Sequence, residues 1–337
     1  MKKQNLIFYI LLIFFLRAFT YDVQICKTED QELTNYYEKY PSKKILAEAE
    51  RIVAELETSY YSYDTIINTK QEKYFVDCSS CLSHVLGMAA YPWYEKIFAY
   101  AVMTRYPQRK NNPPIQRALA KDYANFFMNH DSSLDIFKGW EVITYLEDLE
   151  PGDVIAIKYE DGATNTGHVL ILAGKPMERS PYSGTGGTDT PAGFNEWLVR
   201  IIDSSSSPHG TSSGVSAQYY PRVPDTRTGN SKNIDEGGVG AGYMILVTKG
   251  NTVGVKHRIH GWRRSNLSSS TLYRNDNSDI PSGTIRPIRF GRAIAFDSNP
   301  RYYSDYYGVN VEPISIYKDM NSFVGTGDES GDGGTDS

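Results

Sequence analysis

Apolar residues recur with a helical period in the first half of the chain and with a strand-like pattern in the second. Between residues 41 and 56 they lie three to four positions apart, as on one face of a helix. The members of this face are Ile45, Ala49, Ile52, Val53 and Leu56. Similar spacing predicts helices over residues 94–106 and 114–130. Later runs rich in β-branched residues predict strands at 153–159, 168–173, 198–203, 243–248 and 285–296. Helices followed by an antiparallel sheet indicate the α+β class.

A cysteine stands where a short apolar strand, residues 74–76, meets the predicted start of a helix that runs to about residue 87. Asp77 is a good cap for this helix, and the unpaired N–H groups of its first turn favour the thiolate form of Cys78. Such a thiolate needs a base beside it to act as a nucleophile. His168 begins a later apolar strand. The sequence therefore predicts a catalytic pair of Cys78 and His168.

The order of these motifs resembles that of the NlpC family of papain-like cell-wall cysteine peptidases. The matching segments are Asp77-Cys78-Ser79, Leu149-Glu150-Pro151-Gly152-Asp153-Val154-Ile155 and Gly167-His168-Val169. The resemblance implies a papain-like fold, in which the nucleophile begins a helix packed on an antiparallel sheet. It also implies that Cys78 is the nucleophile and that His168 is the base. Asp203, at the end of the strand 197–203, is expected to orient His168, and His209 is the rival for this role.

Substrate contacts are expected on both sides of this catalytic group. The residues assigned to them are Tyr61, Tyr63, Ser79, His209, Asp225 and Arg227. The two tyrosines are placed there by resemblance alone, and the last three belong to a polar segment, 204–242, whose length indicates a substrate rim. Two features of the family are missing: the Gly-Gly pair that precedes the cysteine, and a glycine where Ser80 stands. The predicted helices between residues 86 and 145 are expected to roof the cleft.

Composition and the first residues indicate an exported globular protein. The 337 residues are 40% hydrophobic and 22% charged, an ordinary globular balance. Residues 1–20 read as a signal peptide, with Lys2 and Lys3 before an apolar run that is too short for a stable membrane anchor. Cleavage would leave a secreted or periplasmic chain. We expect an N-terminal helical segment at 21–66, a papain-like catalytic domain with helical and loop insertions at 67–322, and a disordered acidic tail at 323–337.

The charge balance excludes nucleic acid as a partner. Formal net charge is −5, and it becomes −8 without the signal peptide because Lys2, Lys3 and Arg17 are lost. The basic residues around Arg263 and Arg264 are interpreted as a local solvated face, not as a phosphate-binding stripe. The glycines in 238–242 lack the strand and helix that flank a nucleotide loop. The expected partner is peptidoglycan or another peptide substrate, without a cofactor or metal.

Three alternatives remain open at the level of sequence. The pair Cys78 and Cys81 has the spacing of a redox dithiol and allows a thiol-disulfide oxidoreductase, although such sites ordinarily lie between parallel strands. The same cysteines with His84 and His168 offer four zinc ligands, but two thiols one turn apart on a helix seldom meet at one ion. Taken alone, Cys81 is expected to pack inward and His84 to be a surface or cap residue. The third alternative is a cell-wall-binding module on a peptidase scaffold that no longer cuts.

Overall fold

A computed structural model describes most of the central part of the chain. The described residues are 36–37, 39–105, 115–181, 189–209, 225–250, 254–264, 271–276, 278–281 and 283–296. The predicted signal peptide, 1–20, and the predicted acidic tail, 323–337, lie outside them. Within these ranges, none of the helices has the length and apolarity needed to span a membrane.

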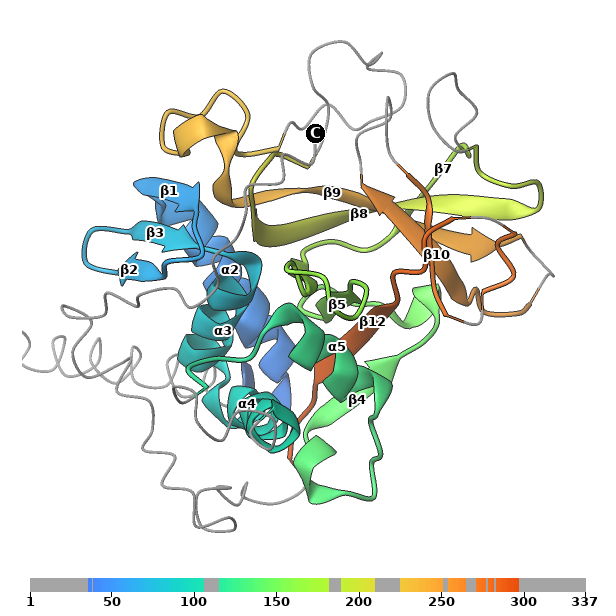
Figure 1. Ribbon diagram of the computed structural model, residues 1–337, viewed down its shortest axis with the longest axis horizontal. Coiled ribbons are helices and arrows are strands. Elements are labelled where there is room, and N and C mark those ends of the chain that lie inside the picture. Colours follow the sequence, from blue (N-terminus) through green and yellow to red (C-terminus); the bar gives the residue numbers. More distant parts are fainter. Residues whose placement is uncertain are drawn as a thin grey trace, which may run out of the picture.

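The mixed α+β class predicted from the sequence is confirmed, with helices first and mostly strands after them (Figure 1). The α-helices are α2 (Pro41–Glu55), α3 (Cys78–Ala89), α4 (Tyr91–Arg105) and α5 (Ala120–Met128). The main sheet contains β4 (Trp140–Ile143), β5 (Val154–Lys158), β6 (Gly167–Leu172), β7 (Met177–Arg179), β8 (Phe194–Ser205), β9 (Gly238–Lys249), β10 (Ile259–Arg264), β11 (Tyr273–Arg274) and β12 (Ile288–Ala293). A small sheet contains β1 (Thr58–Tyr61), β2 (Ile66–Asn68) and β3 (Lys73–Val76). The 3-10 turns are η2 (Asp135–Phe137), η3 (Leu146–Asp148) and η4 (Ile234–Glu236).

The strands of the main sheet pair antiparallel in the order β11-β10-β9-β8-β6-β5-β12-β4, with β7 beside β8. The longest pairing joins β8 to β9, from Phe194 opposite Lys249 to Ser205 opposite Gly238. Both strands continue past their predicted ends, because this ladder carries on through serines and glycines whose side chains give no strand signal. The extension brings the end of β8 to the site described below.

The sheet is buried on both faces, which explains why β5 is continuously apolar. Its Val154 and Ala156 belong to a core shared with the helices. The alternate residues Ile155 and Ile157 belong to a second core formed largely by the strands themselves. Successive side chains of a strand point to opposite faces, so a strand covered on both sides needs apolar residues throughout.

The segment 21–66, expected to be helical, is helical only in part where the structure describes it. After α2 ends at Glu55, β1 and β2 follow and pair with β3, and β1 runs parallel to β3. Stacking of Tyr60 on Phe75, with ring centroids 4.2 Å apart, joins two of these strands. The local reason is the run Thr58-Ser59-Tyr60-Tyr61, which favours strand over helix.

The helices between residues 86 and 145 do not form the expected roof over the site. Their apolar faces are occupied by the first core, where Phe126 and Phe127 are buried against the sheet and Ile97 is buried on α4. None of the described residues in this range, 86–105 and 115–145, lines the pocket beside His168. An apolar face indicates that a helix docks, but it does not say on which side of the sheet.

Candidate active site

Cys78 is the first residue of α3, and it lies where β3 ends. The Asp77 carboxylate accepts a hydrogen bond from the Ser80 N–H at 2.6 Å and so caps the helix, as the sequence predicted. The Ser204 hydroxyl donates to the Val76 carbonyl at 2.6 Å. This bond ties the strand that delivers the cysteine to the end of β8, where Asp203 lies.

Arg117 compensates the negative charge that stands next to Cys78. Its guanidinium pairs with Asp77 at 2.8 Å and donates to the Ser79 hydroxyl at 2.7 Å. Ser79 in turn donates to Asp77 at 3.0 Å and is buried. The expected substrate contact of Ser79 is therefore replaced by a contact within the protein.

His168 begins β6 directly after a glycine that the backbone requires. Gly167 has φ +142°, and a side chain there would collide with the carbonyl of Ile157 on β5. The Nε2 atom of His168 lies 2.6 Å from Oδ2 of Asp203. Burial lowers the pKa of His168, but the negative charge of Cys78 and hydrogen bonds with Asp203 and Cys78 raise it to about 9. His168 thus interacts with the predicted nucleophile on one side and the predicted orienting residue on the other.

Asp203 has a fully buried side chain and receives three hydrogen bonds. Oδ2 lies 2.6 Å from Nε2 of His168 and 2.7 Å from Nε2 of His209, while Oδ1 accepts from Arg227 at 2.9 Å. Burial alone raises the pKa of Asp203, but the charges of His209 and Arg227 and the histidine hydrogen bonds hold it well below its usual range. The group is a carboxylate at any pH near neutrality.

Arg227 and Asp225 stand behind Asp203 and not at the predicted substrate rim. Both are buried, and their side chains pair twice, with Nε–Oδ1 and Nη2–Oδ2 distances of 2.8 Å. Asp225 also accepts from the His209 backbone N–H at 2.7 Å. Because their charges are paired and their side chains are buried, these two residues hold Asp203 and His209 in place. Their position does not favour the substrate contact that the sequence predicted.

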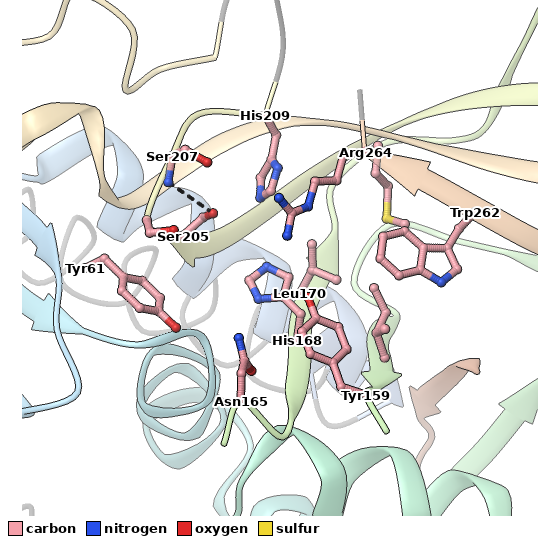
Figure 2. Close-up of a pocket in the computed structure, with 13 residues that line it drawn as sticks. Tyr61, Tyr159, Asn165, His168, Leu170, Ser205, Ser207, His209, Trp262 and Arg264 are labelled. Carbon is pink, nitrogen blue, oxygen red and sulfur yellow. Dashed lines mark hydrogen bonds between the residues drawn. The ribbon is translucent and has the colours of Figure 1, made fainter. Parts of the chain in front are cut away.

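A pocket opens in front of the two histidines (Figure 2). It is lined by Tyr61, Ile157, Tyr159, Asn165, His168, Leu170, Ser205, Ser206, Ser207, His209, Met244, Trp262 and Arg264. Tyr61 and His209 were expected to meet substrate, and both line it. Tyr63 does not: it is 52% exposed and packs edge-on against Tyr61 at 5.6 Å between ring centroids. One wall is aromatic, and none of the described lining residues carries a carboxylate.

Burial raises the pKa of Tyr61, and the negative charges of Cys78 and Asp77 add to the shift. The same cysteine charge contributes to the raised pKa of Tyr159, where burial is again the main cause. Cys78 itself is 5% exposed. Cys78 is not one of the lining residues, but its charge acts on three of them, Tyr61, Tyr159 and His168.

Cys81 and His84 lie on the inner side of α3. Burial, followed by the negative charges of Asp203 and Asp77, raises the pKa of Cys81 to about 12. His84 is 4% exposed, so its expected place at the surface is wrong: one turn after Cys81 it faces the core near Tyr74. Burial lowers its pKa to about 4.

One group of side chains in the described part of the chain has the donor set of a metal centre. His168, Asp203 and His209 each offer a ligand atom, all within 4.8 Å of one another. Two ligands of a tetrahedral zinc ion lie about 3.4 Å apart, given zinc–ligand distances near 2.1 Å. The observed 2.6 and 2.7 Å match hydrogen bonds, so the cluster is built as a hydrogen-bonded group. The alternative zinc set of Cys78, Cys81 and His84 with His168 does not converge among these residues.

Several residues at the site carry no recognisable sequence signal. Arg117 lies in a polar connection, and Tyr159 and Asn165 flank the turn between β5 and β6. Arg263 and Arg264, interpreted as a solvated face, lie on β10: Arg263 is buried beside Glu196, with 3.1 Å between Nε and Oε1, and Arg264 lines the pocket. Only the strand order of the sheet brings β10 to this place.

Comparisons with protein-family models, curated proteins and solved structures find no match to this chain. Within the site, the junction of β3 with α3, the start of β6 and the end of β8 supply a thiol, an imidazole and a carboxylate.

Proposed function

We propose that the protein is an exported cysteine peptidase of the papain-like type that cleaves amide bonds through an acyl-enzyme. The observation that carries this proposal is the hydrogen bond between His168 and buried Asp203 beside a pocket, with Cys78 near enough to His168 for its charge to raise the pKa of the imidazole. The resemblance to the NlpC family supports peptidoglycan stem peptides as the substrate class.

Acylation begins with transfer of the Cys78 proton to His168. Asp203 accepts from Nε2–H of His168, which leaves Nδ1 as the nitrogen that takes this proton. Because the pKa of His168 is raised, its imidazole readily accepts this proton and holds it as the imidazolium. The thiolate attacks the amide carbonyl, and His168 returns the proton to the leaving amine.

The tetrahedral oxyanion needs donors that are in place before it forms. The Cys78 N–H is the first of helix α3, where no intrahelical acceptor exists for it. Tyr61 lines the pocket, and its raised pKa keeps its phenol protonated and able to donate. Water then attacks the thioester with His168 as base, and the free enzyme returns.

The oxidoreductase alternative is less well supported. A raised pKa of about 12 keeps Cys81 as a thiol, and α3 leads to an antiparallel main sheet without the parallel βαβ setting of dithiol sites. Under the proposal Cys81→Ser retains peptide cleavage, whereas a dithiol mechanism loses its activity with either cysteine.

Digestion of purified peptidoglycan tests the proposal. Wild-type protein is expected to release peptides with new amine ends that mass spectrometry identifies, and Cys78→Ala is expected to release none. A wild-type protein that binds the polymer without producing new ends supports the third alternative, a non-cutting cell-wall module, and overturns the proposal.

A further inference from the structure

Two histidines share one oxygen of a buried carboxylate. Nε2 of His168 and Nε2 of His209 lie 2.6 and 2.7 Å from the same atom, Oδ2 of Asp203. Their ring centroids are 5.9 Å apart, and both rings face the pocket (Figure 2). The proposed mechanism uses His168 and Asp203 and gives His209 no task.

The position of His209 is fixed at both ends. Its backbone N–H donates to Asp225 at 2.7 Å, and its carbonyl accepts from the Tyr243 N–H at 3.1 Å. At Gly242 of β9 a Cβ would lie 2.6 Å from the His209 carbonyl oxygen. The strand therefore has no side chain at the position where His209 packs against it. His209 is built into the site and is not a side chain that happens to reach it.

The shared oxygen fixes the protons of both rings. An ionised carboxylate only accepts hydrogen bonds, so each Nε2 that approaches it carries hydrogen. Each donor withdraws part of the negative charge that the carboxylate presents to the other. A carboxylate with a single histidine donor holds that imidazolium more strongly than one whose oxygen is shared.

We propose that His209 is a positioning residue that shares Asp203 with His168 and thereby makes the His168 imidazolium a stronger acid. The catalytic meaning of this inference rests on the proposed function. His168 must protonate a leaving amine, and an imidazolium held too tightly by its carboxylate gives up its proton slowly. Sharing the carboxylate keeps the orientation of His168 while limiting the stabilisation of its charge.

Other charged and titratable groups surround the pair and stay unchanged in the test. They are Cys78 and Cys81 of α3, Tyr61 of β1, Tyr159 after β5, Arg264 of β10, and Asp225 and Arg227 before η4. Arg227 already donates to the other oxygen of Asp203, so the effect of His209 is measured against a carboxylate that keeps one cation.

Nuclear magnetic resonance titration of the full chain with labelled histidine tests the inference without any substrate. In the wild type, His168 is expected to lose its proton near pH 9. His209→Leu removes the second donor and is expected to raise this midpoint by roughly 0.5 to 1 pH unit. His209→Gln retains a side-chain N–H and is expected to stay close to the wild type. His209→Ala carries the same expectation as the leucine variant and replaces it if that variant does not fold.

An unchanged midpoint in the variants without a donor overturns the inference, and so do equal shifts in the glutamine and leucine variants. The titration is independent of peptide cleavage. A protein that shows the expected shifts but cuts no peptide keeps this inference and loses the proposed function. A protein that cuts peptides without the expected shifts keeps the proposed function and loses this inference.

Discussion

Asp203 is the residue on which the electrostatics of the site depend. Its buried carboxylate is stabilised by donors from β6, from His209 and from Arg227, so it remains ionised where an isolated buried acid would take up a proton. The sequence favoured Asp203 over His209 as the partner of His168 because it ends a strand. In the structure His209 also belongs to the cluster, since it hydrogen-bonds to Asp203. Of the two candidates, however, only Asp203 forms a hydrogen bond with His168.

Replacing Asp203 by asparagine is expected to lower kcat by about 10² to 10⁴ with a small change in KM. The amide retains the shape but loses the charge that favours the His168 imidazolium, so the pKa of His168 falls as well. Steady-state kinetics on a stem peptide measure the effect. Asp161→Asn, at a surface carboxylate with an 86% exposed side chain, is the control. Near-normal turnover in Asp203→Asn would remove Asp203 from the mechanism.

At the scale of elements, the junction of β3 with α3 was predictable because its signals are local. A capping aspartate, an apolar entry and the helix it opens all lie within a few residues of Cys78. The start of β6 was predictable for the same reason. The contributions of β9 and β10 were not, because they depend on which strands become neighbours, and no local pattern in 238–242 or around Arg264 reports that.

The alternating glycines of β9 have a structural reason that the sequence did not disclose. A Cβ at Gly240 would lie 2.7 Å from Cγ of Arg227, and one at Gly242 would meet the carboxylate of Asp225. β9 therefore has no side chains at the positions where Arg227 and Asp225, which support Asp203, pack against it. These glycines therefore support the site, although none of them is among the residues that line the pocket.

We expect Gly242→Ala to lower the free energy of unfolding by about 1–3 kcal/mol, because the added methyl displaces a buried ion pair. Activity is expected to fall further than stability explains, since Asp225 also holds the His209 backbone. Urea denaturation and kinetics measure the two effects. Gly174→Ala is the control, because its Cβ would meet only the Cβ of Arg200, at 3.3 Å. Equal behaviour of the two variants would contradict the close-packing explanation.

At the scale of the whole molecule, helix α3 links Cys78, the proposed nucleophile, to the first core. Cys78 begins the helix beside the pocket, while Leu82, Val85 and Leu86 are buried in that core. The sequence predicted the α+β class with an antiparallel sheet, but it did not predict the small sheet or the second core. Their formation depends on contacts between distant strands.

His84, buried in the same helix, makes stability depend on pH. Its folded-state pKa of about 4 lies below the value of 6.5 in an unfolded chain, so the unfolded state binds the proton more readily. The stabilising effect of a neutral His84 is complete above pH 6.5 and is lost as pH falls toward 4, by up to about 3 kcal/mol.

The matched comparison is wild type against His84→Leu, with the free energy of unfolding measured at pH 7 and at pH 4.5. Other acids titrate equally in both proteins, so the difference isolates His84. The leucine variant is expected to lose less stability on acidification. Parallel losses in the two proteins would show that His84 is not the group responsible.

The central claim is that Cys78, activated by His168, forms a covalent acyl-enzyme. Rapid-quench mass spectrometry of the intact protein with a stem-peptide substrate tests it most directly. We expect a transient mass increase equal to the acyl part of the substrate, mapped by proteolysis to Cys78, absent in Cys78→Ala and formed more slowly in Asp203→Asn. Cleavage of the peptide by Cys78→Ala, or an adduct on any residue other than Cys78, would contradict the account.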